Sequence, residues 1–409
     1  MTAQSANGSR TTHRVVVVGA SFAGFTAALE VKRRLKDRVE VTVLDRRDHF
    51  TFIPSLIWLP FGARQASDVT FKLAPVLERK GIRFVHAAAD RIDPDRRVVI
   101  AGGTEYGYDR LVVATGPRLA FERIPGLGPE GGYTQSVCNL DHAELAGAAW
   151  QRFLADPGPV VIGTAQGGSC FGASYEFLLN TRYQLERAGL AGKVPVTFIS
   201  SEPFLGHFGL GGVGNSEERV HRMFDRLGIR GIPNASVDEV RDGEIALAGG
   251  EVLPFRYAMI VPPFAGVDAV VSSPGLANPA GFIPVTDEYR HPEIPEIFAA
   301  GVNIAIAPPK PTPVPSGVPK TGHMSEHMAR VAAQNIAADL AGEKGKRLPI
   351  DQLGAICVLD GGDNGMAIKT DRVFGGGKTR VTAGPHAHLV KLAFEKAFMF
   401  SRRRGSVAF

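Results

Sequence analysis

A glycine-rich turn near the N-terminus restricts the fold of this chain more than any other feature. Residues 14–18 form a β-branched run of the kind that makes a buried parallel strand, and the turn at residues 19–24 follows at once. Residues 25–35 have the pattern of a helix, and a second apolar run at 39–44 ends on Asp45. This order of strand, turn, helix, strand and acid, with the acid about 20 residues after the turn, predicts a dinucleotide-binding βαβ unit.

The residues of this unit have separate roles in holding a dinucleotide. Gly19 permits the tight turn, and Gly24 lets the helix pack close to the strand. The pyrophosphate is expected on the N-terminus of the helix, and Asp45 is expected to accept a hydrogen bond from a ribose hydroxyl. Ser21 replaces the usual middle glycine and Arg46 follows the acid, so both are counted among the predicted contacts. An ordinary βα connection is the alternative, which the position near the N-terminus and the acid after the second strand disfavour.

Two later segments indicate which dinucleotide is bound. Residues 108–116 resemble the strand and turn that close the FAD domain in the pyridine-nucleotide-disulfide-reductase superfamily, and residues 297–302 resemble its second FAD motif. Either segment alone could be a buried strand that ends in a glycine turn, but three motifs in the right order favour FAD. The resemblance adds these predicted FAD contacts: Ala114, Thr115, Gly116, Gly301, Val302 and Lys320.

A second glycine-rich turn lies at residues 163–168, between an apolar strand at 159–162 and a helical pattern at 175–187. Thr164 and Ala165 stand where a nicotinamide dinucleotide site would have its middle glycine, and the next strand does not end in a lone acid. The sequence therefore predicts a second Rossmann-like domain whose nicotinamide binding is weakened. Cys170 follows the turn, where a phosphate would approach.

The composition excludes several classes of protein. Lysine and arginine number 46 against 41 aspartate and glutamate residues, and no basic run is interleaved with aromatic residues as nucleic-acid binding requires. No stretch offers 18 or more uninterrupted apolar residues, so we expect no membrane-spanning helix. Three cysteines are too few for a disulfide framework, and their spacing to histidines does not suit a metal site.

The cysteine-bearing segments give the most specific resemblance. From about residue 14 to residue 405 the chain resembles the sulfide:quinone oxidoreductases. The segments that carry the resemblance are 136–143, 167–177, 202–207, 211–214, 318–322 and 394–398. Their cysteines are far more distinctive than any glycine motif.

The resemblance implies a sulfur chemistry for the three cysteines. Cys170 and Cys357 correspond to the redox pair and Cys138 to a third sulfur nearby. Sulfide would attack the bridged pair, leaving a persulfide and a thiolate, and the electrons would pass through FAD to quinone. Such chemistry is expected to need lowered thiol pKa values. Cys138 is also the expected attachment point if the flavin is covalently bound.

Three ionisable residues near these segments are candidates for proton transfer. Glu176, six residues after Cys170, is a candidate base. His142 and His207 are candidates for carrying protons near the sulfurs, although His142 could simply cap a helix and His207 could be a core residue.

The C-terminal segment is expected to meet the membrane, because quinones reside in the bilayer. Residues 388–400 have an apolar side with helical spacing, and Arg402–Arg404 follow. A short apolar helix beside a basic cluster is typical of in-plane membrane binding. A helix packed on the body with a solvated basic tail is the alternative. Phe394, Phe398 and Lys391 are the predicted quinone or membrane contacts.

The predicted architecture is α/β, with two Rossmann-like dinucleotide-binding domains, a discontinuous FAD domain and a C-terminal membrane-facing region. The expected divisions are a disordered leader at 1–12, the FAD domain at 13–125 and 281–345, the second Rossmann-like domain at 126–280 and the C-terminal region at 346–409. We expect a peripheral protein of the cytoplasmic membrane that binds sulfide, quinone and FAD but no metal or nucleic acid, and a homo-oligomer is left open.

Three other functions are compatible with the sequence. A type II NADH:quinone oxidoreductase is disfavoured by the altered second turn and by cysteines that it would not need. A sulfide dehydrogenase flavoprotein subunit would require a cytochrome partner, and a flavin-bound scaffold or redox sensor would lack turnover.

Overall fold

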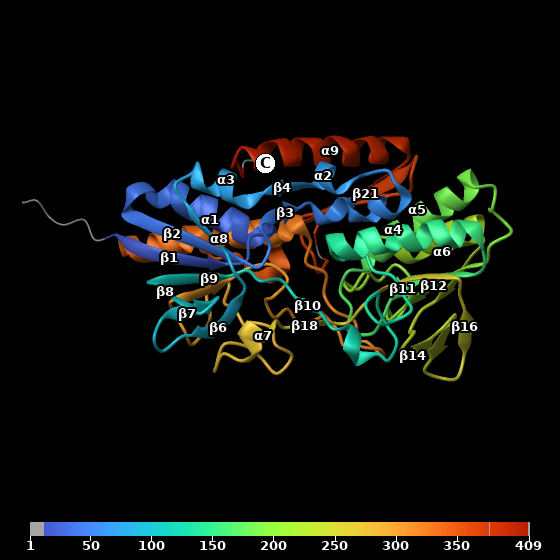
Figure 1. Ribbon diagram of the computed structural model, residues 1–409, viewed down its shortest axis with the longest axis horizontal. Helices are drawn as coiled ribbons and strands as arrows, with labels where there is room; N and C mark the ends of the chain where they lie inside the picture. Colours follow the sequence, from blue (N-terminus) through green and yellow to red (C-terminus); the bar gives the residue numbers. More distant parts are fainter. Residues whose placement is uncertain (1–11, 376, 408–409) are drawn as a thin grey trace, which may run out of the picture.

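The computed structural model describes residues 12–375 and 377–407, so almost all of the predicted leader lies outside the described residues. Figure 1 shows two sheet-containing halves side by side, with the C-terminal helix α9 along one edge of both. The predicted α/β class with two Rossmann-like units is confirmed.

The first half is built on a five-stranded parallel sheet with the strand order β19-β9-β1-β2-β5. Its strands are β1 (His13–Val18), β2 (Val39–Asp45), β5 (Arg83–His86), β9 (Arg110–Val113) and β19 (Ile297–Ala299). The strand β19 comes from a distant part of the chain, because the second half is inserted between β9 and β19. Continuous Val, Leu and Ile runs suit these strands, since helices cover both faces of such a sheet.

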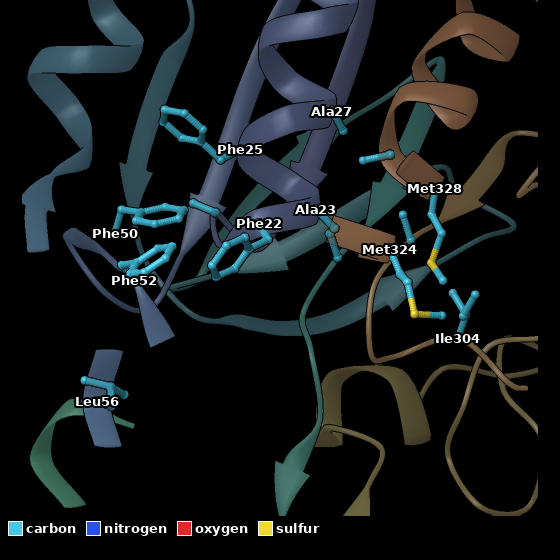
Figure 2. Close-up of a cluster of buried hydrophobic side chains, with 14 of the residues drawn as sticks. Phe22, Ala23, Phe25, Ala27, Phe50, Phe52, Leu56, Ile304, Met324 and Met328 are labelled. Carbon is cyan, nitrogen blue, oxygen red and sulfur yellow. The ribbon is translucent and has the colours of Figure 1, made fainter. Parts of the chain in front are cut away.

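The helix α1 (Phe22–Leu35) follows β1 and packs along α8 (Gly322–Ala341). Figure 2 shows why the two fit: the small Ala23 and Ala27 of α1 face Met324 and Met328 of α8. On its other side, Phe22 meets the aromatic rings of Phe50 and Phe52. The start of α1 is therefore fixed in a fully buried core.

The second half repeats the pattern with a four-stranded parallel sheet, β13-β12-β11-β17. Its strands are β11 (Val160–Thr164), β12 (Val196–Ser200), β13 (Ile229–Ile232) and β17 (Tyr257–Val261), and its helices are α4 (Leu140–Ala155), α5 (Phe171–Arg187) and α6 (Ser216–Leu227). The helices α1 and α5 each begin a few residues earlier than predicted, because their first turns lie inside or directly after the glycine motifs.

Small antiparallel sheets and short helices complete both halves. The sheets are β3 (His49–Thr51) with β4 (Thr70–Lys72), β6 (Ala89–Asp93) with β7 (Val98–Ala101) and β8 (Thr104–Gly107), β10 (Arg118–Leu119) with β18 (Phe264–Ala265), and β14 (Val237–Arg241) with β15 (Glu244–Leu247) and β16 (Val252–Pro254). The short helices are α2 (Ala66–Val69), α3 (Leu73–Glu78), α7 (Asp268–Val271) and the 3-10 segments Lys36–Arg38, Ile53–Phe61, Phe121–Arg123 and Ile350–Gln352.

The C-terminal region consists of an antiparallel sheet and one long helix. The strands β20 (Ala355–Asp360), β21 (Gly365–Thr370) and β22 (Thr379–Ala383) lead into α9 (Pro385–Arg403). The strand β20 packs against both α5 and α9. Within the part of the chain that the structure describes, no helix is long and apolar enough to cross a membrane.

Candidate active site

The predicted FAD contacts meet at one edge of the first sheet. Gly19 follows β1, Asp45 ends β2, Ala114 follows β9 and Gly301 lies two residues after β19. All four strands are parallel, so their carboxyl ends lie at the same edge, where ligands bind in folds of this type. Thr115, Gly116 and Val302 continue the loops at this edge.

Two glycines of the first turn are required by close backbone contacts. A Cβ on Gly19 would lie 2.3 Å from the Ala114 carbonyl oxygen, and Gly19 has a φ of +97°. A Cβ on Gly24 would lie 1.8 Å from the Gly19 carbonyl oxygen. The turn is therefore compressed between β9 and α1, as the predicted dinucleotide motif requires.

The start of α1 offers backbone N–H groups to an anion. Ser21 precedes the helix in an extended conformation and its side chain makes no capping hydrogen bond, and the first turn holds no acidic residue. The Asp45 carboxylate is held by the backbone N–H groups of Ala20 (2.6 Å) and Arg47 (2.8 Å), while Arg46 is exposed beside it. A helix N-terminus of this kind fits a pyrophosphate.

Lys320 adds a positive charge to this edge. Burial lowers the pKa of its ammonium to about 8. Among the described residues no carboxylate forms an ion pair with it; it lies over the ring of Phe282, 5.2 Å from the ring centre. A half-buried cation that forms no ion pair within the described residues fits a cofactor that becomes negatively charged on reduction. Together with the glycine turn, these residues fit FAD.

A proline-rich loop packs onto the second glycine turn. The Gly167 N–H donates to the Pro315 carbonyl (2.7 Å), and the Gly317 N–H donates to the Gly168 carbonyl (2.9 Å). A Cβ on Gly317 would lie 2.6 Å from the Ser169 Cβ, so the two segments are in close contact. The place where a pyrophosphate would approach this turn is thus occupied by the chain itself.

The acid that follows β12 also faces inward. Glu202 is fully buried and accepts hydrogen bonds from the Tyr175 hydroxyl (2.9 Å), the Ser200 hydroxyl (2.6 Å) and the Phe208 N–H (2.5 Å). Burial raises the pKa of its carboxyl to about 7, against the effect of these donors. In a working nicotinamide site an acid near this position would meet a ribose. Here its hydrogen bond with the Phe208 N–H holds the loop that follows β12.

The three cysteines gather at the start of α5. Cys170 is the N-cap residue of α5, Cys138 lies two residues before α4, and Cys357 lies in β20. A Cβ on Gly172 would lie 3.5 Å from the Cys357 sulfur, so this sulfur rests against the first turn of α5, two residues from Cys170. Cys170 also interacts electrostatically with both Cys138 and Cys357. All three thiols are free in the structure.

The expectation of lowered thiol pKa values is wrong for the protein chain as it stands. Burial raises the pKa of Cys138 and of Cys357 to about 12 and raises that of Cys170 as well. Neighbouring groups oppose the rise: the Lys391 ammonium lowers the pKa of Cys357, the Ala173 backbone N–H lowers that of Cys170, and hydrogen bonds from Ser136 and Val137 lower that of Cys138. Sequence reasoning could not weigh this balance, because the burial arises from elements distant in sequence.

Glu176 lies in the same cluster and is paired with a lysine from α9. The Lys391 ammonium donates to a Glu176 carboxylate oxygen, and the Asp360 N–H donates to the same atom (2.9 Å). Glu176 also acts electrostatically on Cys357. Burial raises the pKa of its carboxyl to about 7, although Lys391 opposes the rise. Glu176 is thus positioned to gain or lose a proton near neutral pH beside a sulfur.

A second buried carboxylate in this region was missed by sequence reasoning. Asp360 ends β20 and accepts hydrogen bonds from the Trp58 indole N–H (2.8 Å), the Gly362 N–H (3.1 Å) and His388 Nδ1 (2.6 Å). The His388 side chain is partly exposed. Trp58 also lies under the Lys391 ammonium, 4.8 Å from its ring centre. This hydrogen-bond network connects the cysteine region to α9. The one sequence feature that could have indicated Asp360 is its position as a polar residue at the end of an apolar strand.

The two predicted histidines contact residues other than the cysteines. His142 lies in the first turn of α4, where its N–H is capped by Asn139 (2.8 Å) and its ring meets Phe121 and Glu130. His207 accepts a hydrogen bond from the Gly209 N–H (3.2 Å) and packs on Phe204. Burial lowers the pKa of both imidazoles. Neither has a contact with a cysteine among the described residues.

The helix α9 buries three of its charged side chains and exposes four of its large apolar ones. Lys391 pairs with Glu176, Glu395 accepts from Arg64 (2.8 Å), and Arg402 donates to Glu326 (2.5 Å). By contrast, the exposed fractions are 63% for Leu389, 51% for Val390, 44% for Phe394 and 61% for Phe400.

Two of the three predicted quinone or membrane contacts do not lie on the exposed face of α9. Lys391 is buried in an ion pair, and Phe398 is buried against the rings of Phe22, Phe50 and Phe52. Neither lies on the outer face of α9, whereas Phe394 does. Arg402 is also buried, so only Arg403 and Arg404 of the basic cluster are exposed. The local pattern hides this, because it cannot show that charged residues of α9 have buried partners.

Comparisons with known proteins give the following relatives. Residues 13–329 match the family model of the pyridine nucleotide-disulphide oxidoreductases. The sulfide-quinone reductase of Aquifex aeolicus is 38% identical over 404 residues, which are 96% of this chain and 92% of that protein. The crystal structure of the sulfide:quinone oxidoreductase from Aquifex aeolicus has a TM-score of 0.92 at 36% identity, covering 97% of this chain and 93% of the other. An NADH dehydrogenase-like protein of Mycobacterium tuberculosis is 29% identical, over 70% of this chain and 72% of that protein.

Proposed function

The chain belongs to the pyridine nucleotide-disulphide oxidoreductase family and, within it, to the sulfide:quinone oxidoreductases; on that premise we propose that it oxidises sulfide at Cys170 and Cys357 and passes the electrons through FAD to a membrane quinone. The observation that carries the proposal is the Cys357 sulfur resting on the first turn of α5, beside Cys170. Cys138 is the accessory sulfur in this proposal.

The proposed sulfur chemistry uses the two cysteines in their bridged form. HS⁻ adds to one sulfur, the S–S bond breaks, and the second sulfur leaves as a thiolate. Glu176 takes up the proton of the new persulfide, and the Lys391 ammonium stabilises negative charge beside Cys357. Loss of two electrons then closes the persulfide and the thiolate into a bridge that carries the added sulfur. FAD, when bound, accepts those two electrons and transfers them to quinone.

The first sheet supplies the residues proposed to hold FAD. The amides at the start of α1 would take the pyrophosphate, Asp45 would face a ribose, and Lys320 would balance negative charge on the flavin. Gly19 and Gly24 allow the tight turn before α1, and Gly116 and Gly301 have a positive φ in the loops at this edge.

Membrane attachment through α9 is part of the proposal. An outer helix face that exposes Leu389, Val390 and Phe400, while Lys391, Glu395 and Arg402 are buried, is unusual for a surface helix and suits burial in a lipid interface. Beside it, Arg64, Lys396, Arg403 and Arg404 contribute to a depression of about 770 Å³. Phe394, which packs on Phe52, is the proposed quinone contact, and quinone would reach it from this face.

The electron donor should be sulfide rather than NADH. Anaerobic addition of sulfide should bleach the flavin absorbance, and a soluble quinone should restore it. NADH should leave the spectrum unchanged, because residues 315–317 pack on the second turn and Glu202 faces inward. Dithionite provides the control that the flavin can be reduced. Rapid bleaching by NADH would instead support the type II dehydrogenase alternative.

The proposed role of Glu176 predicts a pH effect. A carboxyl with a pKa of about 7 accepts a proton only when ionised, so its contribution grows as the pH rises through 7. Glu176→Gln should therefore slow flavin reduction by sulfide on the order of a hundredfold at pH 8 and much less at pH 6. The ionisation of sulfide also changes the rate with pH, but it affects both proteins equally. The ratio of the wild-type rate to the variant rate therefore reports the ionisation of Glu176 alone.

Glu326→Gln is the matched control for this measurement. Glu326 is also a buried carboxylate paired with a cation from α9, but its partner is Arg402, far along α9 from Lys391. Stopped-flow rates of this variant should keep the wild-type pH profile. A constant ratio for Glu176→Gln between pH 6 and pH 8 would exclude Glu176 as the base.

A further inference from the structure

A groove with a volume of about 700 Å³ lies outside the proposed active site, between α5, α6 and the β20–β21 turn. Its rim carries Arg182 from α5 and Arg219, Arg222 and Arg226 from α6. The three arginines of α6 are spaced by three and four residues, so they project from one side of the helix. The proposed sulfide and quinone chemistry uses none of them.

The rim has an excess of positive charge. Glu186 and Asp363 are the two carboxylates that line the groove. Arg222 is 3.4 Å from Glu218, whereas the partner of Arg219 is the neutral Asn215 (2.5 Å). For Arg226 the described residues offer no ion pair.

One arginine is already held in position. The Arg182 side chain is largely buried; its Nε donates to the Leu227 carbonyl at the end of α6 (3.1 Å), and its guanidinium lies 3.8 Å from Glu186. An arginine held in this way loses little conformational freedom when it binds an anion, and its planar group suits the oxygens of a phosphate. Among the described residues, the unpaired positive charge of the rim therefore lies on α6.

Beneath the arginines the groove is apolar. Leu179, Val220, Met223 and Leu227 lie along it, and Met366 contributes from β21. A small hydrophilic anion would gain nothing from these side chains. An anion joined to a hydrocarbon chain would contact both the rim and the apolar floor.

The groove reaches the residues that precede α9. Ala383 and Gly384, which end β22 and cap α9, form one of its walls. The exposed Leu389 and Val390 follow about one turn into the helix. Figure 1 shows α5 and α6 at the same end of the molecule as the β21 end of α9. A lipid at the border of the membrane face could therefore reach the groove.

We propose that this groove binds the phosphate headgroup of an anionic phospholipid. The arginines would contact the phosphate and the apolar floor would contact the adjoining hydrocarbon. This inference rests on the proposed membrane attachment, and it adds a lipid preference that neither the sulfur chemistry nor the apolar face of α9 requires.

The test compares two triple variants of the full-length holoprotein. The groove variant is Arg219→Gln, Arg222→Gln, Arg226→Gln. The control is Arg91→Gln, Arg96→Gln, Arg241→Gln, which removes the same charge from strands and turns on the edge opposite α9 (Figure 1). Binding is measured by flotation with vesicles of phosphatidylcholine alone and of phosphatidylcholine with phosphatidylglycerol.

The wild type should prefer the anionic vesicles. The groove variant should lose that preference by about fivefold for each arginine, on the order of a hundredfold in all, and should bind neutral vesicles as before. The control variant should retain the preference. Equal losses in both triple variants would overturn the proposal, because diffuse charge would then explain the binding.

Two further measurements distinguish a lipid in the groove from a free anion and from a second copy of the chain. A soluble short-chain phosphatidylglycerol should raise the melting temperature of the wild type but not of the groove variant, whereas inorganic phosphate should do so much less. An equal effect of phosphate would assign the site to a free anion. A change in the mass of the detergent-solubilised variant without a change in flotation would assign the groove to a second copy of the chain.

The outcome is independent of the proposed reaction. If sulfide fails to reduce the flavin, the proposed function is wrong, while flotation still decides whether the groove recognises lipid. If the groove variant floats like the wild type but turns over sulfide, only the lipid inference is wrong.

Discussion

Replacing either Cys170 or Cys357 by serine should give a folded flavoprotein that sulfide no longer reduces. Serine is close to cysteine in size, but its hydroxyl is not ionised at neutral pH and cannot be carried in a persulfide. Both variants should bind FAD and accept electrons from dithionite. Their rates of flavin reduction by sulfide, measured by stopped flow, should fall on the order of a thousandfold or more, because a nucleophile of the covalent relay is lost.

Cys138→Ser is the matched comparison for these two variants. Cys138 interacts electrostatically with Cys170, whereas the electrostatic partners of Cys357 are Glu176, Lys391 and Cys170. A third sulfur is not needed to open the bridge, so this variant should be slower or bind flavin less tightly without losing the reaction. A wild-type rate in Cys357→Ser would end the assignment of the redox pair. Equal losses in all three variants would place Cys138 in the relay.

The sequence was sufficient for features that are local in the chain. In each Rossmann-like unit, the strand, the glycine turn and the helix are contiguous, and the need for Gly19 and Gly24 follows from backbone geometry alone. Family membership confirms the predicted fold class, FAD as the cofactor and the class of FAD-dependent oxidoreductases. Several element bounds were missed by a few residues: α1, α5 and α9 begin earlier than predicted, and β11 extends into the predicted second turn.

Features that depend on distant partners could not be predicted. Lys391 and Glu176 are 215 residues apart, and Arg402 and Glu326 are 76 residues apart. A local hydrophobic pattern assigns charged residues to the surface. The prediction from the sequence therefore placed Lys391 and Arg402 on the membrane side of the C-terminal helix. The raised thiol pKa values have the same origin, because they depend on burial by elements that only the folded chain brings together.

The same ion pairs decide how membrane attachment should be tested. Deleting α9 would remove Lys391 and Arg402 and leave the buried carboxylates of Glu176 and Glu326 without their cations. Such a loss destabilises a protein strongly, so a soluble but inactive fragment would be uninformative. Substitutions on the outer face of α9 avoid this problem, because Leu389, Val390 and Phe400 are more than half exposed.

The variant Leu389→Gln, Val390→Gln, Phe400→Gln should bind neutral phosphatidylcholine vesicles much more weakly than the wild type. If the exposed part of each side chain enters the lipid, each side chain contributes about 1 kcal/mol to the free energy of membrane binding. Losing all three contributions should lower partitioning about a hundredfold. Turnover with a lipophilic quinone in vesicles should fall with binding, whereas turnover with a soluble quinone should stay near the wild-type value.

The variant Leu145→Gln, Val252→Gln, Val271→Gln is the matched control for this effect. These side chains are also apolar and exposed, but they lie on α4, β16 and the end of α7 rather than on α9. If attachment depended on exposed apolar area in general, both triple variants would leave the vesicles. If α9 is the attachment surface, only the first should do so, and it should do so equally at low and high salt, because the lost contribution is apolar. Flotation of the α9 variant at the wild-type level would place the membrane contact elsewhere on the molecule.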